Sequence, residues 1–402
     1  EHWNTDNPHI HVIVRGVAED GQNLVISRDY IREGMRAQAR AIVTQELGPR
    51  TDLEIRQSLE RQVEAERWTE IDRDLSRTMQ RDGLIDMAPE PGVRPDGDHV
   101  LRMGRLRKLE GLGLASEIAP GQWTLADNAQ AALRELGERD DIIKRMHKAM
   151  SDRGIDRGAG SYVLDADPAQ PVVGRLVDRG LHDELTGKAY AIVDGIDGRT
   201  HHVQLPDIEA TGDCRPGAIV ELRRFEDRKG RQRVALAVRS DMDIEAQVRA
   251  PGATWLDRRN LSSDCHDLGG GFGTEVRAAM EARAEHLADE GLARRQGQRI
   301  IFARNLLDTL RRRELDEAAK ELSAEVGLPH APSKAGEYVA GTVRQRITLA
   351  SGRFAMIDDG LSFQLVPWSP SLDRQIGKHI SGVMRAGGGV DWSFGRGRGL
   401  GL

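Results

Sequence analysis

The sequence predicts an α+β protein of several domains, in which helical regions and β-rich regions follow one another along the chain. Its 402 residues are enough for roughly two to four domains. Residues 49–150 show helical periodicity and helix-capping residues, whereas residues 172–240 show short β-branched runs between Gly- or Asp-rich turns. A mainly helical pattern and a β-type pattern then recur over 241–336 and 337–402. Such segregation is typical of α+β architecture.

The first 48 residues are predicted to contain two strands and a helix. The run 9–15 is β-branched and ends at Gly16, and Asp20-Gly21 is a hairpin signal ahead of a second short strand over 23–26. Ser27 then caps a helix over about 28–46, which Gly48-Pro49 ends. This helix carries an i, i+4 row of like charges, which indicates either a solvated face or phosphate contacts: Arg28, Arg32, Arg36 and Arg40.

Residues 49–150 are predicted to be helical, and the part over about 69–150 has the layout of a winged helix. Apolar residues recur with a helical period over 99–110, and two short strands then flank a Pro120-Gly121 turn before a helix that Asp127 begins. Helix 99–110 is the candidate recognition helix, and its basic residues are candidate DNA contacts: Arg102, Arg105, Arg107 and Lys108. A packing module of the same layout that never touches nucleic acid remains an equal alternative.

Residues 151–171 are rich in Gly and Asp and are predicted to be a linker. Five short strands over 172–240 then suggest a small closed barrel of the OB or SH3-like kind. The segment 241–336 is predicted to be mainly helical, with helices over 275–290 and 299–326.

A second barrel-like module is predicted over 337–402 from an internal similarity. The stretch 187–195 resembles 352–360 at its glycines, its basic residue and two further pairs, Ile192 with Ile357 and Asp194 with Asp359. His201 and His202 are adjacent on a predicted strand, so they face opposite sides and are interpreted as structural or surface residues.

The composition indicates a protein of the cytoplasm. No run approaches the length of a membrane-spanning helix, and Cys214 and Cys265 lack metal-type spacing, so they are interpreted as unpaired thiols of a reducing compartment. The formal net charge of −6 gives no support to nucleic-acid binding, although local fields decide such contacts.

Three histidines near the beginning of the sequence are a candidate metal site. His9 and His11 share one face of a predicted strand, and His2 lies seven residues before His9. Asp6 is placed to accept the far N–H of a ligating imidazole and so to orient it. Three imidazoles suit one divalent ion, and the donor set alone suggests Zn²⁺ or Mn²⁺.

The stretch His2-Trp-Asn-Thr-Asp-Asn-Pro-His-Ile-His11 resembles the three-histidine motif of plasmid relaxases, the mobilization nucleases of the HUH endonuclease superfamily. The likeness includes the histidine spacing, the Asn7-Pro8 step and the apolar strand that follows. Residues 23–34 and the C-terminal part are also similar to relaxases with a long accessory region.

This resemblance implies a metal-dependent transesterase that nicks single-stranded DNA at a plasmid origin of transfer for conjugative mobilization. Residues 1–48 would be the C-terminal part of the antiparallel-sheet relaxase domain, and the metal would be Mg²⁺ or Mn²⁺, with Zn²⁺ as the alternative. The implied partners are origin DNA, other relaxosome proteins and conjugation coupling proteins in the bacterial cytoplasm, with no membrane.

The family places its nucleophilic tyrosine ahead of the histidine motif, so we expect the nucleophile outside this chain and the chain alone to lack nicking activity. Tyr30 is the one tyrosine near the histidines and a candidate substitute, although an aromatic residue on an amphipathic helix is more often a packing residue. Two alternatives remain: a DNA-binding accessory protein without catalysis, and a zinc hydrolase, which lacks an evident general base.

Overall fold

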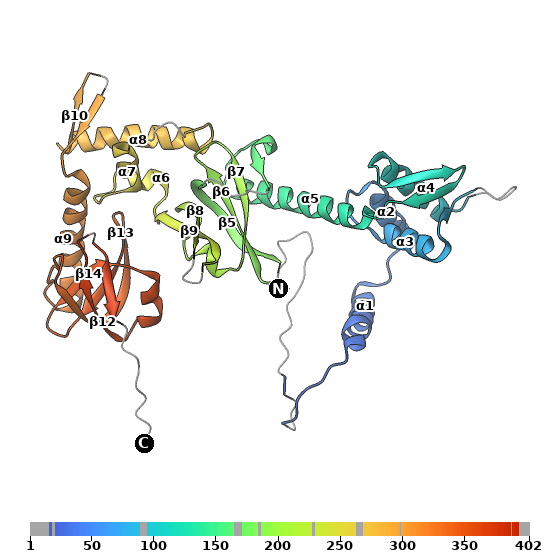
Figure 1. Cartoon of the computed structure of the whole chain (residues 1–402), viewed down its shortest axis with the longest axis horizontal. Coiled ribbons are helices and arrows are strands. Elements are labelled where there is room, and N and C mark those ends of the chain that lie inside the picture. Colours follow the sequence, from blue (N-terminus) through green and yellow to red (C-terminus); the bar gives the residue numbers. More distant parts are fainter. Residues whose placement is uncertain are drawn as a thin grey trace. The chain divides into compact units, whose positions relative to one another are not determined.

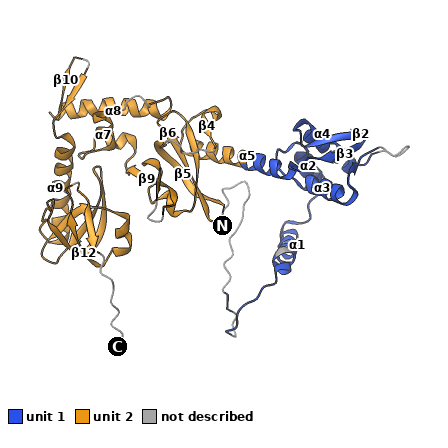
Figure 2. Cartoon of the chain, viewed as in Figure 1, with its two compact units in different colours: residues 1–138 blue, residues 139–402 orange. Residues whose placement is uncertain are grey.

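A computed structural model describes residues 16–17, 21–88, 95–164, 171–183, 186–226, 230–262, 268–297, 299–386 and 388–393. The chain divides into two compact units, residues 1–138 and 139–402 (Figures 1 and 2). Both contain helices and antiparallel sheets, which agrees with the predicted α+β class. Within the part that the structure describes, no helix combines the length and apolar character needed to cross a membrane.

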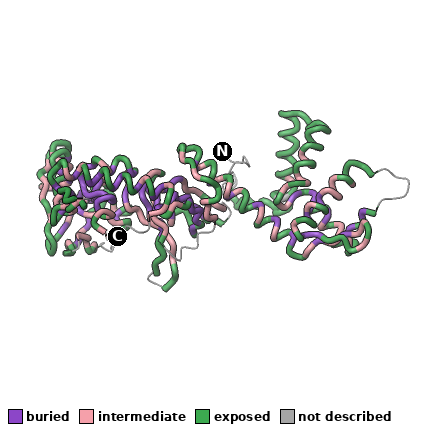
Figure 3. Tube along the Cα trace, turned by 90° about the horizontal axis from the view of Figure 1, so that it is seen from above, coloured by how far each residue is buried: buried purple, intermediate pink, exposed green. Residues whose placement is uncertain are grey.

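The first described helical stretch consists of a π-helical turn, η1 (Tyr30–Gly34), and α1 (Met35–Leu47). It matches the predicted helix over about 28–46, and α1 buries none of its residues (Figure 3). The predicted strand over 9–15 lies outside the described residues. The predicted strand over 23–26 is wrong, because a single antiparallel bridge from Asn23 to Val17 is the only strand pairing described there.

Unit 1 is built from α2 (Asp52–Glu64), α3 (Glu70–Asp82), β1 (Ile85–Asp86), α4 (Gly97–Gly111), β2 (Ala115–Ala119), β3 (Gln122–Leu125) and the start of α5 (Ala129–Ser151). Helices α2 and α3 begin at capping boxes, in which the hydroxyls of Thr51 and Thr69 accept from the third helical N–H. The strands form a sheet of order β1-β3-β2. Apolar side chains of α3, α4, β3 and α5 meet in one core: Leu75, Leu106, Leu109, Trp123 and Leu133.

The first β-module consists of β4 (Tyr162–Val163), β5 (Val173–Asp183), β6 (Lys188–Gly195), β7 (Thr200–Leu205), β8 (Ile219–Glu226) and β9 (Gln232–Ser240). Their order is β4-β7-β6-β5-β8-β9, and no strand pairing joins the two ends of this described sheet. The predicted closed barrel is therefore not formed by hydrogen bonds. The 3-10 turn η3 (Glu209–Thr211) contacts both β6 and β9.

Part of the predicted linker belongs to this β-module. Tyr162 and Val163 pair in parallel with Thr200 and His201, so β4 extends the sheet beyond β7. Because α5 runs from unit 1 into unit 2, the boundary between the units falls inside a helix rather than in the predicted linker.

The segment between the β-modules contains α6 (Ile244–Val248), α7 (Trp255–Leu261), α8 (Phe272–Asp289), β10 (Ala293–Gln296), β11 (Arg299–Phe302) and α9 (Leu306–Val326). Helix α8 matches the prediction over 275–290. The predicted helix over 299–326 is wrong at its start, because Arg299–Phe302 pairs with Ala293–Gln296 as an antiparallel ribbon. Positive φ at Gly297 gives the turn between these strands.

The second β-module consists of β12 (Tyr338–Leu349), β13 (Gly352–Asp358), β14 (Phe363–Pro367), the turn η4 (Pro370–Gln375), β15 (His379–Met384) and β16 (Val390–Ser393). Its strand order, β14-β13-β12-β15-β16, repeats the order β7-β6-β5-β8-β9 of the first β-module. Both sheets are open among the described residues.

The two β-modules also share their irregularities. The bulge in β5 after Leu176 corresponds to the bulge in β12 after Val343. At the same place, Gly217 N–H donates to Leu176 O at 2.8 Å, and Gly377 N–H donates to Val343 O at 2.8 Å. In this register Asp194 corresponds to Asp358, one residue away from the predicted pairing with Asp359.

The helical parts repeat as well, and we call residues 52–151 and 244–326 the first and second helix–ribbon modules. Leu114 N–H donates to Leu109 O at 2.8 Å, and Leu292 N–H donates to Leu287 O at 2.8 Å. Ala126 N–H then donates to Leu114 O, as Ala303 N–H does to Leu292 O, which fixes the following helix in the same register. The described chain therefore contains two tandem copies of a helix–ribbon module followed by a β-module.

Candidate nucleic-acid interface

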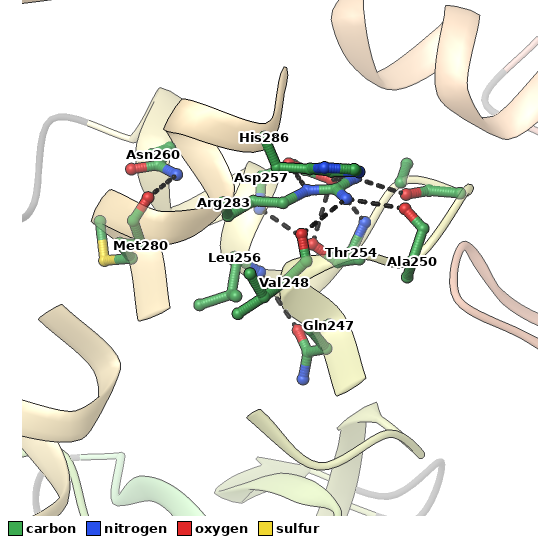
Figure 4. A network of polar contacts seen from close by, with 12 residues as sticks. Gln247, Val248, Ala250, Thr254, Leu256, Asp257, Asn260, Met280, Arg283 and His286 are labelled. Atoms are coloured by element: carbon green, nitrogen blue, oxygen red, sulfur yellow. Dashed lines mark hydrogen bonds and ion pairs between the residues drawn. The ribbon is translucent and has the colours of Figure 1, made fainter. Parts of the chain in front are cut away.

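A buried arginine–aspartate pair holds the helices of the second helix–ribbon module together. Thr254 and Asp257 form the capping box of α7, so the Asp257 carboxylate lies at the N-terminus of that helix. Arg283 of α8 meets it with two hydrogen bonds, Nε to Oδ1 at 2.9 Å and Nη2 to Oδ2 at 3.0 Å (Figure 4). The guanidinium also donates to the carbonyls of Val248, Ala250 and Gly252.

The first helix–ribbon module contains the same network. Arg105 of α4 pairs with Asp72 of the α3 capping box through Nε–Oδ1 at 2.7 Å and Nη2–Oδ2 at 2.8 Å. It also donates to the carbonyls of Val63, Ala65 and Arg67. All five N–H donors of a guanidinium are thereby used inside the protein.

Arg105 therefore does not fit its predicted role as a DNA contact. Its side chain is fully buried, as is that of Asp72. The helical period of 99–110 places residue 105 on the core side of α4, together with the buried Leu106 and Leu109. Its guanidinium faces the turn that precedes α3. Arg105 instead holds α4 against α3 and the turn after α2.

The other basic residues of α4 differ in how free they are to contact a ligand. Arg107 is exposed. Lys108 is half-buried and donates to Glu66 Oε1 at 3.1 Å, so its charge is partly neutralised. Arg102 is half-buried and donates to the Thr78 hydroxyl. Of the four predicted contacts on α4, Arg107 is the one that faces solvent without a described anionic partner.

The predicted contacts over residues 28–40 lie along the exposed helical stretch that includes η1 and α1. Arg28, Arg36 and Arg40 are exposed, whereas the side chain of Arg32 is outside what the structure describes. Tyr30 is also exposed, and its hydroxyl donates to Gln38 Oε1 at 3.3 Å. The predicted metal ligands His2, His9 and His11, together with Asp6, lie outside the described residues. Among the residues that are described, no group of His, Cys, Asp or Glu side chains has the arrangement of a metal site.

A balanced ionic cluster that sequence reasoning missed joins α8 to the first β-module. Arg157 Nη2 lies 2.6 Å from Glu275 Oε1 and 3.0 Å from Asp194 Oδ2, and Arg175 bridges the same two carboxylates. Burial alone would lower the pKa of Arg157, but its hydrogen bonds with Glu275 and Asp194 outweigh this and raise it. Two cations meet two anions here, so the cluster positions α8. No sequence spacing links these residues, which come from β5, β6, α8 and the loop after α5.

The adjacent histidines of β7 are structural, which is one of the two roles that the sequence allows. His201 Nε2 lies 3.0 Å from Asp197 Oδ2, whereas His202 is fully buried and stacks on Tyr190 at 5.5 Å between ring centroids. Burial, with the nearby Arg145 and His182, lowers the pKa of His202 to about 4. The predicted free thiol at Cys214 is buried and unpaired, and burial raises its pKa.

Comparison with known proteins gives one family. Residues 102–232 and 222–401 match the profile of a family described as a protein of unknown function (DUF3363), and the chain belongs to that family. Neither the curated proteins nor the solved structures contain a match to the chain. The family description assigns no chemistry, so function must be argued from the residues themselves.

Proposed function

We propose that this protein is the metal-binding and accessory part of a relaxase-type, DNA-nicking enzyme of the HUH class, acting at a plasmid origin of transfer in the bacterial cytoplasm. The observation that carries the proposal is the motif of His2, His9 and His11 with Asn7-Pro8 inside it. The intervals of seven and two residues, and the strand-type run after them, are far more specific than a pair of histidines alone.

The three imidazoles would hold one divalent ion, Mg²⁺ or Mn²⁺ rather than Zn²⁺, and Asp6 would orient one of the rings. When bound, the ion supplies Lewis-acid neutralisation of the scissile phosphate. A tyrosine oxygen attacks phosphorus and the 3′-oxygen of the cleaved strand leaves, which gives a 5′-phosphotyrosine and a free 3′-hydroxyl. Phosphodiester energy is retained, so the strand can be rejoined.

In this proposal the described part of the chain holds DNA and relaxosome partners. The helix–ribbon modules have the helix, two-stranded ribbon and helix order of winged helices, and the β-modules have the strand order of small barrel-like folds. The candidate phosphate contacts within it are the exposed Arg107 on α4 and the arginines of the helical stretch over residues 28–40.

The test compares the wild-type protein, expressed from its complete coding sequence, with the His9→Ala/His11→Ala variant. Supercoiled plasmid that carries the cognate transfer origin is incubated with Mg²⁺ or Mn²⁺, and nicked DNA with covalently attached protein is measured. We expect the variant to lose nicking and Mn²⁺ binding, the latter measured by calorimetry. The His147→Ala/His379→Ala variant, which removes two exposed histidines outside the motif, is the matched control.

Nicking that survives the loss of His9 and His11 would refute the proposal. If the protein binds DNA without sequence preference and forms no covalent adduct with either Mg²⁺ or Mn²⁺ present, the accessory-protein alternative would be supported instead.

A further inference from the structure

The two helix–ribbon modules have the same fold but opposite charge on their ribbons. In the common register of the ribbons, residues 294, 295 and 299 correspond to residues 116, 117 and 122. Residue 304, just after the second ribbon, corresponds to residue 127, because Ala303 and Ala126 make equivalent hydrogen bonds. The second module has arginine at all four positions, and the first has Ser116, Glu117, Gln122 and Asp127.

The second ribbon presents two of its arginines on one outward face. Arg294 pairs with Ile301, and Gln296 pairs with Arg299, so these four side chains share a face of the ribbon. Ala293 and Phe302 are on the opposite face and pack against the core between α8 and α9. Arg294 and Arg299 are exposed, and Ile301 between them is 41% exposed.

The anions near this face do not neutralise it. Arg294, Arg299 and Arg304 make no ion pair with a residue that the structure describes. Arg295 lies 3.6 Å from Glu285, but both side chains are about two-thirds exposed, so this pair is weak. The exposed face of α8 carries several acidic residues: Glu281, Glu285, Asp289 and Glu290. The β10–β11 ribbon, and not α8, is therefore suited to an anionic partner.

We infer that the β10–β11 ribbon binds the phosphate backbone of duplex DNA, a contact that does not depend on the histidine motif. A two-stranded β-ribbon fits the major groove of B-DNA. Diagonal cross-strand neighbours such as Arg294 and Arg299 lie roughly 7–8 Å apart, with their Cβ atoms somewhat closer, so their long side chains can reach separate phosphates of one DNA strand. The first ribbon has Glu117 and Asp127 where the second has Arg295 and Arg304, so it repels the same partner.

The test uses the Arg294→Ser/Arg299→Gln variant, which installs the residues that the first ribbon already carries in the same fold. The full chain is titrated into short fluorescein-labelled duplex DNA of arbitrary sequence at salt concentrations between about 50 and 200 mM. We expect the variant to bind roughly tenfold more weakly at low salt. The slope of log affinity against log salt should fall by about 1.8, because each phosphate that is no longer neutralised reduces the slope by about 0.9.

The Lys320→Gln/Arg374→Gln variant removes the same net charge from exposed positions of α9 and η4 and should leave affinity and slope unchanged. The single Arg299→Gln variant, with an expected slope change of about 0.9, provides a test if the double variant proves unstable in thermal unfolding. Equal affinity and slope for the ribbon variants and the wild type would overturn the inference. Tighter binding of the single strand than of the duplex would also overturn it. A wild-type protein, expressed from its complete coding sequence, that binds duplex DNA through the ribbon but does not nick origin DNA would count against the proposed function alone.

Discussion

Removing the Asp257 carboxylate should destabilise unit 2 more than any surface change. In Asp257→Ala the Arg283 guanidinium stays fully buried between α7 and α8 and loses both of its charged acceptors. Breaking a buried ion pair by deleting one partner costs about 3–5 kcal/mol. The same substitution removes the acceptor for the Thr254 N–H and hydroxyl, and a buried donor left without a partner costs about 1 kcal/mol more.

The free energy of unfolding is measured by urea denaturation, and hydrogen exchange of the amides in α7 and α8 locates the change. Asp289→Ala removes an exposed carboxylate from the same module and should change stability by less than about 0.5 kcal/mol. Asp72→Ala makes the equivalent change in the first helix–ribbon module, and its loss should be confined to unit 1.

A loss below about 1 kcal/mol for Asp257→Ala would refute this reasoning, because it would mean that water or another group solvates Arg283. A double-mutant cycle with Arg283→Leu isolates the pair. We expect a coupling free energy of about 2 kcal/mol or more, since the two side chains share two hydrogen bonds.

Two further predictions concern the first β-module. Because burial lowers the pKa of His202 from 6.5 to about 4, the unfolded state binds the extra proton, and stability should be lost as pH falls from about 6.5 to 4, by up to about 3 kcal/mol. Urea denaturation at several pH values should show this loss in the wild type and a flatter profile in His202→Phe; equal profiles would contradict it. Gly174→Ala should cost about 1–3 kcal/mol in the same assay, because its Cβ would overlap the carbonyl oxygen of Asp194. Gly158→Ala, where a Cβ meets nothing within 4 Å, is the matched control, and an equal cost at both sites would argue against the close approach.

Local chemistry made much of the secondary structure predictable. Thr51 and Thr69 begin helices because a hydroxyl and a following carboxylate satisfy free N–H groups, and that pattern is visible in the sequence. The β10–β11 ribbon was misassigned because its strands are only four residues each. Half of β10 is arginine, and an apolar run as short as that of β11 does not distinguish a strand from a helix.

Other features of the structure depend on tertiary contacts and could not be predicted from local sequence. Arg105 looks like its neighbours Arg102 and Arg107, and its burial follows from an aspartate far away in the sequence, Asp72. The repeat of the β-modules was predicted one residue out of register, because it aligned Gly187 with Gly352. Gly187 precedes β6, whereas Gly352 is the first residue of β13 and pairs with Leu349.

The duplication separates residues that the fold requires from residues that are free to serve function. Both helix–ribbon modules retain the buried arginine, its capping-box aspartate and the carbonyls around the guanidinium, because removing any part leaves a buried charge or dipole unsatisfied. The exposed positions of the ribbons carry no such constraint, and there the copies differ in sign of charge, as Glu117 and Arg295 do. Since the same backbone accepts either charge, the fold does not explain the difference, and the contrast points to distinct partners for the two ribbons.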